Sequence, residues 1–462
     1  MVIQGHFVIN ALRIRNFKSL ADTGDLRIKP LTFLVGPNSS GKTSIIQSLL
    51  LLKQTVESRD LKNPLSINGP YVQLGSYPDL LYMHDDKVKF EVDIGFAPSV
   101  QTWLPTGLRA DSSRFDTADH YTQVSTNVQF GYNKKTMQVF LSKCGFQLSP
   151  QGYRLEISKS SGTGYQVQFQ NPETGGNDQK PIRFKSVEKF YAARYLGPSR
   201  AMEPRSSTQY RRGLTLLSNQ LAREIEGLFS RVFYIGPLRE SPKRIYIATG
   251  EAPQDVGLKG ELSVDVLWVQ ARRKSTRERL LGRVNHWMQG FGLAADVRLK
   301  RVGGNNYSVV FEDPNTHLKV NLADVGFGAS QVLPIVIEGF YARERAMLLV
   351  EQPEIHLHPK AQGVLGDLLI DIATFEGGKT ILVETHSEHV LSRIRRRISE
   401  KRISRDNVAI YYCEPTVNGT RVQEISINSS GQYEPAGLPE GFFEEGYQES
   451  LEQFKTLASQ ST

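Results

Sequence analysis

A glycine-rich run that ends in a lysine and a threonine carries the strongest chemical signal in the sequence. Residues 36–43 read GPNSSGKT and fit the pattern GxxxxGK[ST]. In such a run, Gly36 and Gly41 let backbone N–H groups face inward and bind anionic oxygens. Lys42 then reaches the β and γ phosphates of a nucleotide, and the Thr43 hydroxyl binds Mg²⁺. The predicted residues for ATP are Gly36, Pro37, Asn38, Ser39, Ser40, Gly41, Lys42, Thr43 and Ser44.

A second signal is an acid at the end of an apolar strand. The stretch MLLVEQPEIHLHP spans residues 347–359, and its apolar residues lead directly to Glu351. This pattern brings a carboxylate to the carboxyl end of a buried parallel strand, where Glu351 can hold Mg²⁺, usually through water. The alternating His356 and His358 offer a second hypothesis, a different metal site, because alternate residues of a strand share a face.

A histidine follows the next apolar strand, in the stretch ILVETHSEHVL. His386 lies between two hydroxyl residues just past the predicted strand end, and its ring N–H can donate to a terminal phosphate oxygen. A strand-end histidine bonded only to backbone is the alternative. The two upstream motifs favour γ-phosphate sensing.

The stretch DVGFGASQVLPIV, residues 324–336, predicts the start of a helix. Gly326, Gly328 and Ser330 precede an apolar run, so their N–H groups would face outward and form an anion site.

The elements that must position these residues alternate between strands and helices at both ends of the chain. Strands are predicted in ALRIRNFKSL and LRIKPLTFLVG, and a helix with a broad apolar face follows Thr43. Residues from about 87 to 190 form short alternating runs rich in Tyr, Phe and Val, which indicates a β-rich segment. Helices are predicted at about 214–230 and 262–290, and strands alternating with helices return after about residue 305.

Composition sets limits on the class of protein. The chain has 462 residues, 39% of them hydrophobic and 23% charged, with a net charge of +8. These values predict two or three globular domains and modestly favour anionic partners. Cys144 and Cys413 have no metal-ligand spacing, so we expect two buried free thiols. No long apolar run and no secretory pattern is visible, so we expect a cytoplasmic protein with no membrane partner.

Together the motifs resemble ABC ATPases of the OLD, RecF and SMC-like group. In that group an apolar strand ends in Asp-Glu-Pro and a Leu-Asp pair follows. The resemblance places Glu351 on the magnesium-binding Asp, Gln352 on the catalytic Glu, and Leu357-His358 on the pair at the dimer interface. It implies an α/β fold: an ABC-like split P-loop ATPase head with a β-rich insertion and a helical arm.

The predicted domains follow from this resemblance and from the element pattern. Residues 1–86 form the N-terminal lobe of the head, and 87–300 form the β-rich and helical insertion. Residues 301–415 form the C-terminal lobe, and 416–462 form an accessory segment.

Gln352 departs from the family pattern with a consequence for catalysis. A glutamine cannot accept the proton of an attacking water, although it can orient that water. Either Glu354 supplies the base, or hydrolysis is slow and the protein is chiefly an ATP-held switch.

The resemblance also assigns the remaining residues of the site. His386 corresponds to the switch histidine, and Gly328 and Ser330 lie in a degenerate signature that caps ATP on another subunit. It implies a head-to-tail homodimer or a larger homo-oligomer. Gln73, in NGPYVQLGS, is predicted to link Mg²⁺ or the attacking water to the insertion.

The segments NFKSL, FYIGPLRESPKRIY and INSSGQYEPAGLPEGFFEEGYQE extend the resemblance along most of the chain. The last is similar to a carboxy-terminal domain of unknown function on bacterial ATPases near OLD proteins. Relatives include ATPase subunits of anti-phage systems such as PARIS, which work with a toxin or nuclease. Roughly 70 residues follow His389, fewer than the ~100 that a TOPRIM nuclease domain needs, so we expect the effector to be a separate chain.

Three functional hypotheses follow. The chain is an ATP-dependent switch that controls a partner effector in phage defence, a RecF-like DNA repair ATPase, or a nucleotide-bound scaffold. The basic stretch 392–405 bears on the second hypothesis, because it can contact DNA or an acidic partner, or form only a solvated helix face. Its basic residues are Arg393, Arg395, Arg396, Arg397, Lys401, Arg402 and Arg405. A second basic stretch contains Arg272, Arg273, Lys274, Arg277 and Arg279.

Overall fold

The structure is a computed structural model. It describes residues 9–98, 102–105, 108–109, 120–160, 164–172, 181–184, 186–191, 205–272 and 274–434. Most of the tail motif beyond Glu434 lies outside this range, as do Arg273 and the side chains of Lys274 and Arg277.

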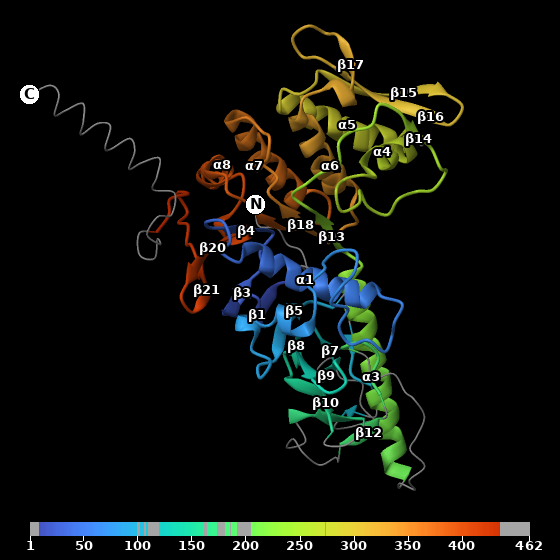
Figure 1. The fold of residues 1–462 in the computed structure, drawn as a ribbon, viewed down its shortest axis with the longest axis vertical. Coiled ribbons are helices and arrows are strands. Elements are labelled where there is room, and N and C mark those ends of the chain that lie inside the picture. The colour runs from blue at the N-terminus through green and yellow to red at the C-terminus, as the bar shows by residue number, and fades with distance from the viewer. Residues whose placement is uncertain are drawn as a thin grey trace, which may run out of the picture.

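A six-stranded, mainly parallel sheet forms the centre of the molecule (Figure 1). Its order is β13 (Val232–Ile235), β18 (Met347–Glu351), β19 (Thr380–Glu384), β4 (Leu31–Val35), β20 (Val408–Thr416) and β21 (Gly419–Glu424). Only β21 runs antiparallel to its neighbour. Strands β4, β18 and β19 are buried at every position, which explains their unbroken apolar runs. The phosphate-loop strand β4 is separated from the acidic strand β18 by β19.

A nine-stranded antiparallel sheet forms a second layer. Its order is β12 (Ile182–Phe184), β11 (Tyr165–Gln170), β10 (Tyr153–Lys159), β9 (Gln138–Ser149), β8 (Gln123–Asn133), β5 (Phe90–Phe96), β1 (Ala11–Phe17) and β2 (Leu20–Asp22), with β3 (Leu26–Arg27) on β1. Buried residues alternate with more exposed ones along β10 and β11. The predicted β-rich stretch is therefore confirmed. The same sheet contains β1 from before residue 87 and β5 from after it. The domain boundary at residue 87 stays a prediction.

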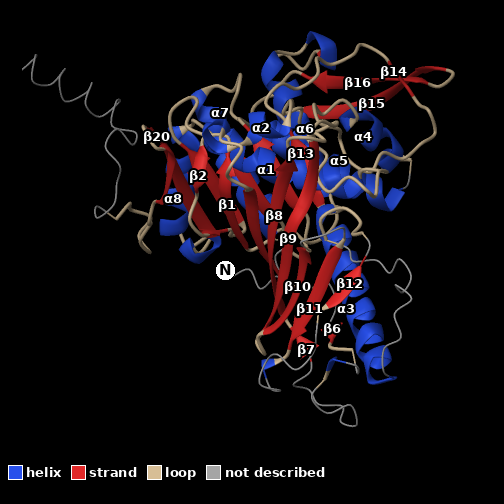
Figure 2. Cartoon of the chain, turned by 60° about the horizontal axis from the view of Figure 1, so that its bottom comes forward, coloured by secondary structure: helices blue, strands red, loops and turns tan. Residues whose placement is uncertain are grey.

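Helix α1 (Lys42–Glu57) lies between the two sheets. Its residues Ile45 and Leu49 share a core with β1, β5 and β8 on one side and with Leu34 and Leu382 of the parallel sheet on the other. Helix α3 (Arg205–Phe229) packs beside α1. In Figure 2 the long antiparallel strands β8 to β11 extend away from the parallel sheet with α3 alongside.

The opposite face of the parallel sheet is covered by helices. These are α5 (Lys274–Gly290), α6 (Phe327–Tyr341), α7 (Pro359–Thr374) and α8 (Glu388–Ser399). Alternate sheet residues such as Phe33, Leu348 and Val383 point into this second core. The helical predictions at 214–230 and 262–290 are confirmed by α3 and by α4 (Ser263–Ala271) with α5.

A small lobe completes the described part of the chain. It contains a four-stranded sheet of β14 (Tyr246–Ile247), β16 (Asn306–Glu312), β15 (Asp296–Gly303) and β17 (Lys319–Asn321). The remaining short elements are α2 (Tyr77–Leu80), β6 (Thr102–Trp103), β7 (His120–Tyr121), and the 3₁₀ turns η1 (Tyr82–His84), η5 (Leu322–Asp324) and η6 (Arg405–Asn407). None of the described helices has the length and apolar character needed to cross a membrane. Both cysteines are buried free thiols, as expected.

Candidate functional site

The glycine-rich run forms the turn between β4 and α1. Strand β4 ends at Val35, and α1 begins at Lys42 with Gly41 as its N-cap. Gly36 and Gly41 have φ angles of 137° and 89°, which L side chains rarely adopt. A Cβ on Gly36 would collide with the Cys413 carbonyl, and one on Gly41 would collide with the Thr420 hydroxyl. Both glycines are therefore required by the close packing of this turn.

Lys42 lies within the turn that it follows. Its Nζ donates to the carbonyl oxygens of Gly36 at 3.0 Å and Pro37 at 2.7 Å. Burial lowers the pKa of Lys42, and the negative charge of nearby Glu384 partly offsets this lowering. The turn thus combines a helix N-terminus with an amine, which suits binding of phosphate.

Two carboxylates lie next to the loop at the ends of neighbouring strands. Glu351 ends β18 and Glu384 ends β19, and the two residues pair in register. Thr43 donates its hydroxyl to Glu384 at 2.8 Å, and the Tyr234 hydroxyl donates to Glu351 at 3.0 Å. Burial raises the pKa of both carboxyls. At Glu351, burial and the charge of Glu384 together raise the pKa to about 7.

This arrangement fits a divalent cation. Both carboxyls are buried with a raised pKa, and the charge of Glu384 adds to the rise at Glu351. A positive charge beside them would stabilise their ionised forms, and carboxylate and hydroxyl oxygens are preferred Mg²⁺ ligands. Thr43, Glu351 and Glu384 would hold the ion. Within the described ranges, no cluster of three or more His, Cys, Asp or Glu forms a complete metal site from protein groups alone. Phosphate oxygens and water would complete the coordination.

The turn after β18 brings Gln352 and Glu354 toward the same edge. Gln352 has a φ angle of 45°, and its N–H donates to the Glu384 carbonyl at 2.8 Å. Glu354 accepts from the N–H of His386 at 2.7 Å through Oε1. Its Oε2 is buried and has no partner at hydrogen-bond geometry among the described residues. Burial raises the pKa of Glu354, and the His386 N–H and the nearby Thr385 hydroxyl partly offset this rise. Glu354 therefore has a free acceptor for a proton or a water.

His386 follows β19 as predicted. His386 is an exposed residue, and partial desolvation together with the charge of Lys42 lowers its pKa. A neutral imidazole near pH 7 can donate one ring N–H to a phosphate oxygen. The structure thus brings together Lys42, Thr43, Glu351, Glu354 and His386 from three separate motifs.

The predicted signature segment begins α6, with Gly326 as the N-cap. The Ser330 hydroxyl donates to the Phe327 carbonyl at 2.8 Å, and Gly328 packs against the turn residues His356 and Leu357. The described contacts of Gly328 and Ser330 do not include the phosphate loop. Phe327 is 65% exposed, whereas Ser330 is 7% exposed, so only the first residues of the segment face outward.

The structure does not bring Gln73 to this site. Gln73 is exposed, and the N–H of its neighbour Val72 donates to Gln54 at 3.0 Å. Gln54 lies in the fourth turn of α1, roughly 18 Å along the helix from Lys42. The loop packs there because Gln54 satisfies its backbone groups, a contact that the spacing of the motif could not reveal.

The strand-face argument for a histidine metal site is wrong, because β18 ends at Glu351. His356 and His358 instead lie in the following turn. His356 has a φ angle of 62° and its ring lies 5.7 Å from that of Phe327. His358 caps α7, where its Nδ1 accepts from the Lys360 N–H at 3.3 Å.

Three residues of this site were not predicted: Glu384, Tyr234 and Arg239. Arg239 is 8% exposed and donates to the carbonyls of Glu351 at 2.9 Å and Gln352 at 3.1 Å. A sequence signal existed for Glu384, since ILVE ends in an acid as MLLVE does. No sequence signal indicated Tyr234 and Arg239, because their contacts with the Glu351 turn depend on the pairing of β13 with β18.

Comparison with protein families gives a match to the machinery just described. Two segments, residues 8–101 and 275–391, match the AAA ATPase domain. The first contains the phosphate loop, and the second contains the signature segment, Glu351, Glu354 and His386. This match supports an ATPase domain interrupted by an unmatched segment. No curated protein sequence matches the chain.

Solved structures give weak likenesses to heads of SMC proteins. The SMC head domain from Thermotoga maritima has a TM-score of 0.39 at 9% identity, covering 91% of this chain and 99% of that one. An SmcHead bound to the C-winged helix domain of ScpA has a TM-score of 0.42 at 11% identity, with 91% and 98% covered. The Smc head with an extended coiled coil bound to the C-terminal domain of ScpA from Pyrococcus furiosus has a TM-score of 0.43 at 11% identity, with 90% and 96% covered. Likenesses at this level give no weight to a functional assignment.

Proposed function

We propose that the protein binds ATP with Mg²⁺ and hydrolyses it to ADP and phosphate. The observation that carries the proposal is the convergence of Lys42, the Thr43–Glu384 hydrogen bond and Glu351 at one end of the parallel sheet. Lys42 and the α1 N-terminus would bind the β and γ phosphates. Mg²⁺ held by Thr43, Glu351 and Glu384 would neutralise charge on the phosphates.

Glu354 is the proposed base. Its carboxylate has one oxygen bonded to the His386 N–H and one buried oxygen without a partner in the described structure. The free oxygen can take a proton from water, while Gln352 can only orient that water. His386 would contact the γ phosphate. Because Glu354 acts from two residues beyond the usual position, we expect slow turnover.

Slow turnover suits a switch, and we infer that the chain is a nucleotide-dependent switch subunit. It would control a separate nuclease or toxin in a prokaryotic anti-phage system, an inference that rests on the resemblance of its motifs. The exposed α6 start, with Phe327 beside Gly328, would cap ATP on a second copy in a head-to-tail dimer or larger oligomer. A scaffold without useful turnover is the alternative that Gln352 keeps open.

The RecF-like alternative depends on a basic DNA-binding surface. In α8, Arg393 and Arg397 both pair with Asp367, and Arg397 also pairs with Glu400. The guanidinium of Arg395 lies 4.0 Å from the centroid of the Tyr433 ring. Arg393, Arg395 and Arg397 are thus used within the protein, which weakens the DNA-contact interpretation.

The test is ATP hydrolysis by wild type, Lys42→Ala and Glu354→Ala. We expect measurable Mg²⁺-dependent turnover in wild type and background rates in both variants. Equal background rates in all three proteins would refute the proposed ATPase activity and leave the nucleotide-bound scaffold as the function.

Gel shifts at two salt concentrations test the DNA alternative, which requires strong, salt-sensitive binding. A neighbouring gene for a toxin or nuclease would support the defence role.

A further inference from the structure

Arg239 holds the turn that carries the proposed catalytic residues. One guanidinium nitrogen donates to the Glu351 carbonyl at 2.9 Å. The other donates to the carbonyls of Gln352 and Pro237, both at 3.1 Å. Two consecutive carbonyls at the end of β18 are therefore held by one rigid, planar cation. The left-handed conformation of Gln352 lies between them.

Arg239 is placed by a strap, which we define as residues 236–240. The strap leaves β13 and is held by two backbone hydrogen bonds, from Gly236 N–H to the Leu258 carbonyl at 2.8 Å and from Glu240 N–H to the Lys259 carbonyl at 2.9 Å. The chain that follows the strap enters the small lobe at β14. The position of Arg239 therefore depends on contacts outside the nucleotide-binding loop.

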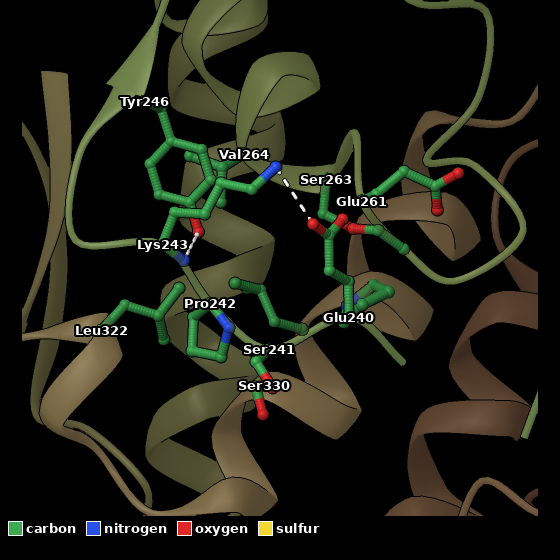
Figure 3. A pocket seen from close by; sticks show the side chains of 13 residues that line it. Glu240, Ser241, Pro242, Lys243, Tyr246, Glu261, Ser263, Val264, Leu322 and Ser330 are labelled. Atoms are coloured by element: carbon green, nitrogen blue, oxygen red, sulfur yellow. Dashed lines mark hydrogen bonds and ion pairs between the residues drawn. The ribbon is translucent and has the colours of Figure 1, made fainter. Parts of the chain in front are cut away.

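The strap also adjoins the start of α6. Glu240 and the next residues line a small pocket together with Ser330 and Pro334 of α6 (Figure 3). Within this pocket, Lys243 pairs with Glu240 at 3.0 Å. The strap thus lies between the predicted signature helix and the turn after β18.

Two buried polar atoms remain unbonded near this turn. They are Nε of Arg239 and Oε2 of Glu354, neither of which has a hydrogen-bond partner in the described part of the chain. A donor and an acceptor are seldom buried unbonded without a reason. Arg239 therefore binds the turn through its two terminal nitrogens alone. The position of the Glu354 Oε2 atom depends on how that turn is held.

We propose that Arg239 is a positioning residue, which fixes the Glu351–Gln352 turn and so aims the side chains of Gln352 and Glu354 at the nucleotide. The proposal rests on the proposed ATPase function. Arg239 acts through the backbone and makes no contact with the phosphate loop in the described structure. Its loss should lower kcat and leave ATP affinity nearly unchanged. Lysine keeps the charge but cannot hold two carbonyls in a fork, so it should restore only part of the rate.

The experiment compares Arg239→Gln, Arg239→Lys and the control Arg298→Gln with wild type. Arg298 is an exposed residue of β15 that pairs with Asp296. Steady-state hydrolysis gives kcat and KM, and titration with a fluorescent ATP analogue gives Kd. We expect Arg239→Gln to lose about 10–100-fold in kcat, the range for residues that orient site ligands. Its Kd should stay within about threefold, and Arg239→Lys should lie between it and wild type.

Hydrogen exchange of residues 351–357 supplies a measurement that needs no turnover. The Gln352 N–H and the Leu357 N–H, which donate to the carbonyls of Glu384 and Glu354, should exchange faster in Arg239→Gln and at the wild-type rate in Arg298→Gln. If Arg239→Gln does not fold, Arg239→Lys decides by the same two measurements. Unchanged kcat and exchange would overturn the proposal, as would a loss confined to ATP affinity. A wild type without hydrolysis refutes the proposed function instead, and exchange then decides the positioning role.

Discussion

Replacement of Glu338 by glutamine should change how stability depends on pH. Glu338 lies in α6, is 0% exposed, and accepts one hydrogen bond, from the Val256 N–H at 2.8 Å. Its other oxygen, Oε1, has no partner among the described residues. Burial raises the pKa of this carboxyl to about 8 from 4.5, so the folded protein keeps a proton that the unfolded chain releases between these values.

The sign and size follow from that difference. Since the folded state binds more protons, this group lowers the free energy of unfolding as pH rises, by about 1.4 kcal/mol per pH unit between pH 5 and 7. Glutamine does not titrate. The free energy of unfolding of Glu338→Gln relative to wild type should therefore rise by about 3 kcal/mol from pH 5 to pH 7.

The assay is urea denaturation of both proteins at pH 5, 6 and 7, without nucleotide and with EDTA. Glu251→Gln serves as the control, because Glu251 is exposed and lies outside α6. Its difference from wild type should stay flat with pH. Parallel pH profiles of wild type and Glu338→Gln would refute the reasoning, because they would show that the buried carboxyl titrates as it does in the unfolded chain.

Three further predictions concern the site and α8. Tyr234→Phe removes the donor to the buried Glu351 carboxylate and should cost about 1–3 kcal/mol of unfolding free energy in EDTA at pH 8; no loss in urea denaturation would contradict this. Gln352→Glu should raise kcat at least about tenfold if this position can hold a base, and an unchanged rate would support Glu354 alone. Asp367→Asn leaves Arg393 and Arg397 without their shared partner and should lower unfolding free energy by about 1–3 kcal/mol, whereas unchanged stability would mean that α8 does not need this network.

The sequence predicted the elements whose residues are buried on both faces. Strands β18 and β19 have unbroken apolar runs because helices cover the parallel sheet on both sides, and each run ends where its polar residue meets the site. The turn at Gly36 was predictable because few residues tolerate its backbone. Local pattern and local conformation therefore agree at these positions.

The rest of the site depends on contacts between distant segments. Tyr234 and Arg239 reach Glu351 only because β13 pairs with β18, a neighbour relation that no local pattern encodes. Gln73 was assigned by motif resemblance, and its loop instead packs on Gln54. The sequence likewise left DNA contact, an acidic partner and a solvated helix face open for α8, because the pairing of Arg393 and Arg397 with Asp367 of α7 depends on helix packing.

The central claim is that the loop from Gly36 to Thr43 binds ATP together with Mg²⁺. Calorimetric titration of wild type and Lys42→Ala with ATP, with and without Mg²⁺, tests it most directly. The account predicts saturable binding to wild type that Mg²⁺ strengthens, and a loss of at least about tenfold in affinity in Lys42→Ala, where the charge that contacts the phosphates is gone. Equal binding by both proteins, or no binding by wild type, would contradict it.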